Sequence, residues 1–108
     1  MTTITKGNKI LTLINVFTVE PVNQQKLIDL LTLATEGSVL KIEGFISASL
    51  HRSLDGTKVT MYAQWRSIED YQRMRSNPVA SPYLEQALTM ATFESVMYEV
   101  VGSFSPAT

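Results

Sequence analysis

Residues 45–66 read FISASLHRSLDGTKVTMYAQWR, two β-rich runs joined by a turn. Phe45–Leu54 and Val59–Arg66 are rich in the branched and aromatic side chains that favour strands. The Asp55-Gly56 pair between them is a strong signal for a tight turn, because both residue types tolerate a positive φ. This stretch therefore predicts an antiparallel β-hairpin in the middle of the chain.

One further strand is predicted on each side of the hairpin, over Ile10–Val19 and Phe93–Phe104. Both runs carry apolar residues on both of their alternating faces, whereas a strand with one solvated face alternates more cleanly. In the first run one face carries Leu11, Leu13, Asn15 and Phe17, and the other carries Ile10, Thr12, Ile14 and Val16. We therefore expect this strand to be covered on both sides.

The first connection, after Val19, reads as a helix. Pro21 suits the first turn, since its fixed φ and missing N–H cost nothing there. Apolar residues then recur at helical spacing at Leu27, Leu30, Leu31 and Ala34, with Ile42 on the same stripe. The helix is predicted to end between Gly37 and Lys41, and Gly44 marks the return to a strand.

The second connection, after Arg66, reads as a broken helix. Ser67, with Asp70 three residues later, resembles a capping box at a helix start. Asn77-Pro78 is predicted to end this helix, and Ser81-Pro82 to begin the next.

The element order is β-α-β-β-α-β, which predicts an α+β ferredoxin-like domain with a four-stranded antiparallel sheet. Its helices cover one sheet face and leave the other bare. The bare face would be apolar, with Thr12, Ile14 and Val16 from the first strand and Val96, Tyr98 and Val100 from the last. Apolar patches of this kind mark interfaces, so we predict a homodimer through this open face, as a dimeric α+β barrel. The domain is expected to span residues 10–104, between tails at 1–9 and 105–108.

The composition of the chain argues against several classes of function. The chain has 108 residues, 44% hydrophobic and 18% charged, with a formal net charge of −1. Without a basic run, no nucleic-acid partner is expected, and without a basic amphipathic helix or a long apolar run, no membrane partner. The absence of cysteine excludes disulfides and thiolate catalysis. With no apolar signal core at the start of the chain, a cytoplasmic location is expected.

Several side chains are candidates for chemistry, and each also has a structural interpretation. Trp65 is either a core residue or an aromatic wall for a planar substrate. Asn15 interrupts an apolar strand face, so its amide needs either a structural partner or a substrate. His51, the only histidine, fits a rim position better than a general base, and alone it makes a poor metal site. Tyr71 is either a proton donor or a core residue whose hydroxyl contacts water, and Ser38 on the first helix also fits a small packing residue. No dinucleotide, P-loop or hydrolase-elbow signature is present.

The hairpin sequence, and above all the Tyr-Ala-Gln-Trp block at 62–65 after Asp55-Gly56, resembles the antibiotic biosynthesis monooxygenase (ABM) family. The strand at 14–19 matches as well, and the resemblance extends from about Ile10 to Val101. It implies a dimeric α+β barrel that oxidises aromatic polyketide intermediates to quinones. It implies O₂ as co-substrate, with no flavin, haem or metal.

The resemblance also implies site residues. Asn15, Trp65 and Tyr71 correspond to catalytic positions, and we add Phe17, Met61 and Ser38 as substrate-binding candidates. Two positions depart from the family pattern. Met61 stands where an Asn is frequent, and Glu85 falls near a position that holds Arg in part of the family. The lone His51, on a strand, argues against the haem-degrading branch.

The leading hypothesis is therefore a cofactor-independent monooxygenase acting on a small phenolic substrate. The alternative is a non-catalytic module that binds or signals with the same cavity, which Met61 and Glu85 favour. A third hypothesis is an isomerase or cyclase acting on a reactive carbonyl compound, which would not need O₂.

Overall fold

A computed structural model describes residues 10–76 and 81–107. The elements are β1 (Leu11–Val19), α1 (Gln24–Gly37), β2 (Phe45–Arg52), β3 (Lys58–Trp65), α2 (Ile68–Arg75), α3 (Ser81–Ala87) and β4 (Ala91–Tyr98). Short 3₁₀ turns at Pro21–Asn23 and Val39–Lys41 flank α1. The predicted break at Asn77-Pro78 and the tail at 1–9 lie outside the described residues.

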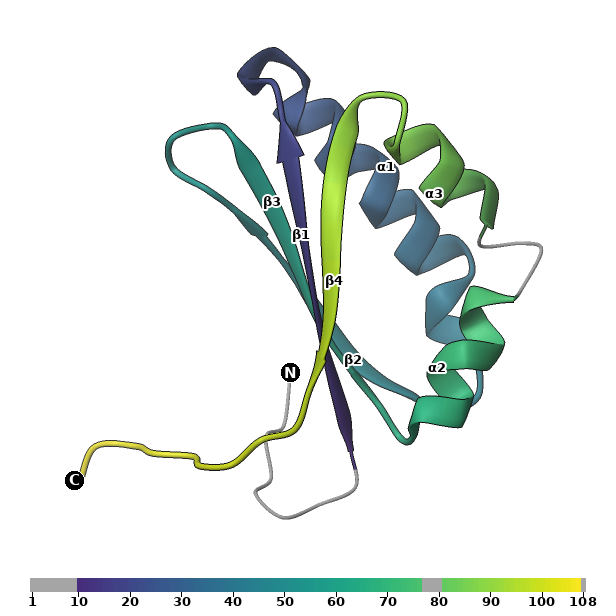
Figure 1. The fold of residues 1–108 in the computed structure, drawn as a ribbon, viewed down its shortest axis with the longest axis vertical. Helices are drawn as coiled ribbons and strands as arrows, with labels where there is room; N and C mark the ends of the chain where they lie inside the picture. Colours follow the sequence, from purple (N-terminus) through teal and green to yellow (C-terminus); the bar gives the residue numbers. More distant parts are fainter. Residues whose placement is uncertain (1–9, 77–80, 108) are drawn as a thin grey trace.

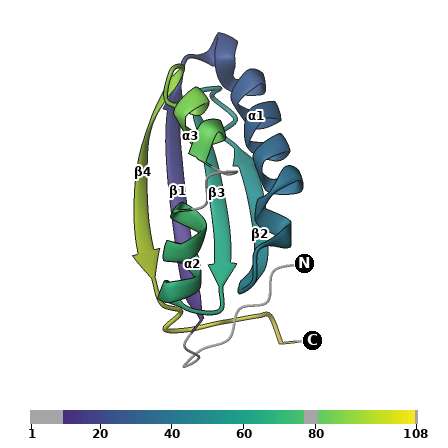
Figure 2. The same ribbon diagram turned by 90° about the vertical axis from the view of Figure 1, so that its right-hand side faces the viewer.

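The four strands form one antiparallel sheet in the order β2-β3-β1-β4. The helices lie together on one face, with α1 along one side and α3 and α2 in line along the other (Figures 1 and 2). The ferredoxin-like α+β fold predicted from the element order is therefore confirmed. The described helices leave the opposite face of the sheet uncovered.

The central hairpin forms as predicted, with two corrections. β2 ends at Arg52 rather than Leu54, and β3 runs from Lys58 to Trp65. Of the two turn residues only Gly56 has a positive φ, of 84°, so Asp55 does not adopt the conformation that the Asp-Gly signal implied. Instead, the Asp55 carboxylate accepts hydrogen bonds from the Thr57 N–H at 3.0 Å and from two hydroxyls, which makes a wider turn.

The prediction for the last strand was wrong at both ends. β4 begins at Ala91 and ends at Tyr98, before the predicted limit at Phe104. Tyr98 pairs with Thr12 near the start of β1, so the chain beyond it has almost no neighbouring strand to bond. Val100 consequently lies beyond β4 and outside the sheet. The domain limit at residue 104 stays a prediction.

The start of α2 is fixed by polar contacts. The Ser67 hydroxyl accepts a hydrogen bond from the Asp70 backbone N–H at 3.2 Å, which confirms the predicted cap. The Asp70 side chain is 2% exposed and forms ion pairs with Arg66 at 2.8 Å and Arg73 at 3.0 Å. Gly44, at φ 91°, lies so close that a Cβ there would be 2.3 Å from the Asp70 Cγ.

The core has two parts, one at each end of the helical layer. The larger joins β1, β3 and β4 to α1 and α3, and contains Phe17, Val19, Leu27, Leu30, Leu31, Val59, Ala87 and Ala91. The smaller lies beneath α2 and contains Leu11, Leu13, Ala63, Trp65 and Tyr71. Within the described ranges, no helix is long and apolar enough to cross a membrane.

Candidate active site

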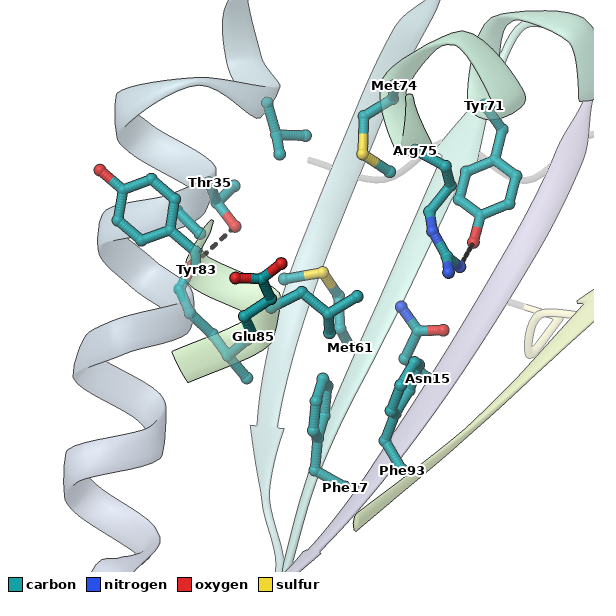
Figure 3. A pocket seen from close by; sticks show the side chains of 14 residues that line it. Asn15, Phe17, Thr35, Met61, Tyr71, Met74, Arg75, Tyr83, Glu85 and Phe93 are labelled. Carbon is teal, nitrogen blue, oxygen red and sulfur yellow. Dashed lines mark hydrogen bonds between the residues drawn. The ribbon is translucent and has the colours of Figure 1, made fainter. Parts of the chain in front are cut away.

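A cavity of about 270 Å³ lies between the helices and the covered face of the sheet. That volume is near the lower end of the roughly 300–1,000 Å³ usual for small-molecule sites, so it suits one small ligand. Figure 3 shows the side chains that line it. The lining is Asn15, Phe17, Leu31, Ala34, Thr35, Val39, Met61, Tyr71, Met74, Arg75, Tyr83, Leu84, Glu85 and Phe93.

The sheet contributes a mainly aromatic floor. Phe17 of β1 and Phe93 of β4 are direct neighbours across the strands, and their rings stack at 5.1 Å between centroids. Met61 of β3 is paired with Asn15 of β1 and lines the same cavity. These side chains share one face because alternate residues of a strand point the same way. The floor is therefore suited to a flat apolar ring.

Hydrogen-bonding groups gather at the α2 end of the cavity. Arg75 Nη1 donates to the Tyr71 Oη at 2.9 Å, and both side chains lie above Asn15 (Figure 3). The Asn15 Oδ1 is buried and has no hydrogen-bond partner among the described residues. Because an unsatisfied buried amide oxygen is costly, it is a natural point for a ligand to bind.

Tyr71 is held in place from two sides. The centroid of its ring lies 6.1 Å from that of the Trp65 ring. Trp65 in turn meets the Phe45 ring edge-on, with 5.3 Å between the centroids. The preceding residue, Asp70, is anchored by Arg66, whose hydrogen bonds lower the pKa of that carboxyl below its ordinary value. The first turn of α2, and with it the Tyr71 hydroxyl, is thereby fixed relative to the sheet.

The structure brings together four of the six predicted site residues. Asn15, Phe17, Met61 and Tyr71 all line the cavity. Trp65 does not, since it is 1% exposed and lies behind Tyr71. The roles of all four stay predictions.

Two other candidates also lie away from the cavity lining. Ser38 is buried just beyond α1, and its hydroxyl donates to the Ala34 carbonyl at 2.8 Å. His51 is exposed on β2, where its ring contacts the Ser49 hydroxyl at 2.9 Å. The role of Ser38 likewise stays a prediction.

Sequence reasoning missed Arg75 as a lining residue. Its position four residues after Tyr71 puts both on one face of a helix, and that spacing was the available signal. Tyr83 and Phe93 were also missed, because they reach the cavity only through the placement of α3 above it and of β4 beneath it. Among the described residues, no group of three His, Asp or Glu side chains is arranged to hold a metal ion.

Known proteins resemble this chain in sequence. The sequence model of the antibiotic biosynthesis monooxygenase family matches residues 10–86, which is most of the chain. The chain belongs to the ABM family. The tetracenomycin-F1 monooxygenase of Streptomyces glaucescens is 38% identical over 104 residues, covering 96% of this ABM chain and 93% of that protein. At this level of similarity the ABM chain is identified as a monooxygenase.

Solved structures show the same fold. A monooxygenase from the gene ActVA-Orf6 of Streptomyces coelicolor, in complex with nanaomycin D, has a TM-score of 0.81 and is 28% identical. The match covers 90% of the ABM chain and 92% of that structure. SnoaB of Streptomyces nogalater, a cofactor-independent oxygenase, has a TM-score of 0.75 at 19% identity, covering 91% and 99%. The cytoplasmic location stays a prediction.

Proposed function

We propose that this ABM protein oxidises a small aromatic or polyketide-like phenol to a quinone, with O₂ as co-substrate and without flavin, haem or metal. The observation that carries the proposal is the cavity of about 270 Å³, which has an aromatic floor and hydrogen-bonding groups gathered at one end. The 38% identical relative is named for oxidation of tetracenomycin F1, and the S. coelicolor structure holds nanaomycin D. Both names support an aromatic ligand.

The reaction balances without a further reductant. A phenol with a hydrogen on the ring carbon para to its hydroxyl takes up O₂ and gives a quinone and water. One oxygen atom becomes the new carbonyl, the other leaves as water, and the substrate supplies all the electrons. Loss of the phenolic proton makes the ring electron-rich enough to reduce O₂. The protein's contribution is to bind and orient the ring, exclude water and stabilise the developing anion.

Each candidate residue has a proposed task. Asn15 and Tyr71 bind the substrate oxygen, while Phe17 and Met61 hold the ring. Trp65 acts through Tyr71 as a positioning residue, because it touches that ring and does not line the cavity. Ser38 fixes the end of α1 through its bond to Ala34, and so shapes the cavity wall indirectly.

Oxygen uptake with anthrone as the probe tests the assignment. Asn15→Ala should lower turnover about a hundredfold, as loss of one donor to a developing anion does elsewhere. Trp65→Phe should lower it about tenfold, because Tyr71 loses its support and small misplacements are costly. His51→Gln, at an exposed position outside the lining, is the matched control and should leave turnover unchanged. Unchanged uptake in the first two variants would refute the assignment.

A non-catalytic binding module remains the second candidate, and Met61 favours it. Its thioether, opposite Asn15, is only a weak acceptor and brings no hydrogen-bond donor to that wall. Calorimetric binding of anthrone under nitrogen, with no uptake when oxygen is admitted, would establish the binder. An isomerase or cyclase would form product under nitrogen.

We also propose that the protein is a homodimer through the open sheet face. The side chains there include Ile14 and Val16 of β1, and Val96 and Tyr98 of β4, the last two 44% and 46% exposed. Pairing two such faces would remove this apolar surface from water. Light scattering should give twice the chain mass of 12.0 kDa, and Val96→Glu should reduce it to that of one chain. A single-chain mass for the wild type would overturn the dimer.

A further inference from the structure

Two opposite charges line the cavity, one on each of two helices. Arg75 comes from α2 and Glu85 from α3 (Figure 3). The other titratable lining residues are Tyr71 on α2 and Tyr83 on α3. The lining side chains of the sheet and of α1 are uncharged: Asn15, Phe17, Met61, Phe93, Leu31, Ala34 and Thr35. Arg75 and Glu85 are therefore the charged side chains in the described lining of the cavity.

Arg75 is oriented toward the polar end of the cavity. Its Nη1 donates to the Tyr71 Oη at 2.9 Å, and its guanidinium carbon lies 6.0 Å from the centre of the Tyr71 ring. Only one of the five N–H donors of a guanidinium is used in this bond. Because the phenol oxygen accepts from Arg75, the Tyr71 hydrogen is directed elsewhere, and a ligand oxygen in the cavity is a suitable acceptor.

The same end holds the Asn15 amide, whose Oδ1 is buried without a partner among the described residues. Rotation of the side-chain amide exchanges its oxygen and nitrogen, so Asn15 can also present an N–H donor to a ligand. A cation, a phenol and an amide together form a site for an anionic oxygen. Glu85 would repel such an oxygen from the α3 side.

We propose that Arg75 is the residue that selects an anionic oxygen on an aromatic ligand and holds it between Asn15 and Tyr71, while Glu85 disfavours binding of that oxygen at the α3 side. The inference rests on the proposed function and deepens it, since an ionised phenol is the form that reduces O₂. The anionic oxygen can belong to a phenolate or to a ring carboxylate. Arg75 acts on either by charge and by hydrogen bonding.

The test uses bound probes under nitrogen, so that it needs no oxidation. Absorbance of 2-naphthol reports its ionisation in the presence of saturating protein over a range of pH. Calorimetry gives the dissociation constants of 2-naphthoate, as the carboxylate probe, and of 2-methoxynaphthalene, which carries no ionisable oxygen. The variants are Arg75→Gln, Arg75→Lys and Glu85→Gln. Lys26→Gln, at an exposed position on α1 outside the cavity, removes a charge as the matched control.

In the wild type, bound 2-naphthol should ionise about one pH unit lower than free 2-naphthol, since a nearby cation stabilises the phenolate. Arg75→Gln should abolish this shift and weaken 2-naphthoate about three- to tenfold. Arg75→Lys should restore most of both effects, and Glu85→Gln should strengthen them. Binding of 2-methoxynaphthalene should be unchanged in every variant.

Three outcomes would overturn the inference. The first is a 2-naphthol ionisation and a 2-naphthoate affinity that Arg75→Gln leaves unchanged. The second is an equal loss for 2-methoxynaphthalene, which would mean that Arg75 only supports the fold. The third is an equal effect of Lys26→Gln, which would indicate a general charge effect. Failure of anthrone oxidation would count against the proposed function alone, because the probe measurements do not depend on it.

Discussion

The two ends of the helical layer differ in the contacts that attach them to the sheet. At one end α1 and α3 bury a continuous apolar cluster that includes Leu27 and Phe17. At the other end the short α2 exposes Ile68 and is secured by the buried Asp70 carboxylate and its ion pairs with Arg66 and Arg73. Apolar burial is strong and non-directional, whereas ion pairs and hydrogen bonds fix orientation. The first end buries the larger apolar cluster, whereas at the second the ion pairs of Asp70 add to the smaller cluster and position Tyr71.

The largest effect on stability is expected at the apolar end. Leu27 is fully buried in the larger cluster and does not line the cavity. Leu27→Ala should lower the free energy of unfolding by about 2–5 kcal/mol through lost burial and a cavity. Urea denaturation measures this. Val22→Ala, on a side chain 80% exposed, is the control and should change stability by less than about 0.5 kcal/mol.

Gly44→Ala tests the polar end and should have the next largest effect. The φ of 91° is unfavourable for alanine, and the new Cβ would lie 2.3 Å from the Asp70 Cγ. Strain and displacement together should cost about 2–3 kcal/mol. Because Asp70 must move, oxygen uptake should fall further than it does in Leu27→Ala at matched folded fraction. Equal uptake in the two variants would contradict the proposal that the α2 end positions Tyr71.

Acid should weaken the hairpin turn and the α2 end, and this is the smallest predicted effect. Hydrogen bonds from Thr57 lower the pKa of Asp55 from 3.8 to about 2, and those from Arg66 also lower the pKa of Asp70. A lowered folded-state pKa means that each carboxylate stabilises the fold above its unfolded pKa and loses this contribution as the pH falls through its folded pKa. Stability should therefore decline below about pH 4.

Thermal melts between about pH 6 and pH 2 measure this decline. Asp55→Asn and Asp70→Asn should each flatten the pH dependence. Only Asp70→Asn should also lower oxygen uptake at neutral pH, because Asp55 lies in the hairpin turn and does not line the cavity. The opposite pattern would place the positioning role at the other end of the molecule.

Local signals in the sequence were sufficient for the fold and for part of the site. The hairpin, the Ser67 cap and the side of the sheet that carries Asn15 depend on neighbouring residues and on strand alternation, both of which can be read along the chain. The end of β4 could not be predicted this way, because it depends on where β1 begins. Arg75 and the position of Trp65 behind Tyr71 depend on how α2 lies over the sheet, which involves contacts distant in sequence.

Consecutive residues of β1 serve opposite sides of the sheet, with Asn15 and Phe17 on the cavity side and Ile14 and Val16 on the proposed dimer side. Single substitutions in this strand can consequently alter ligand choice or assembly one at a time, and evolution can adjust the two traits separately. Insertion or deletion of one codon within Leu11–Val19 would turn every residue on one side of the change to the opposite face. Relatives that diverge in substrate are therefore expected to differ here by replacements and to keep the length of the strand.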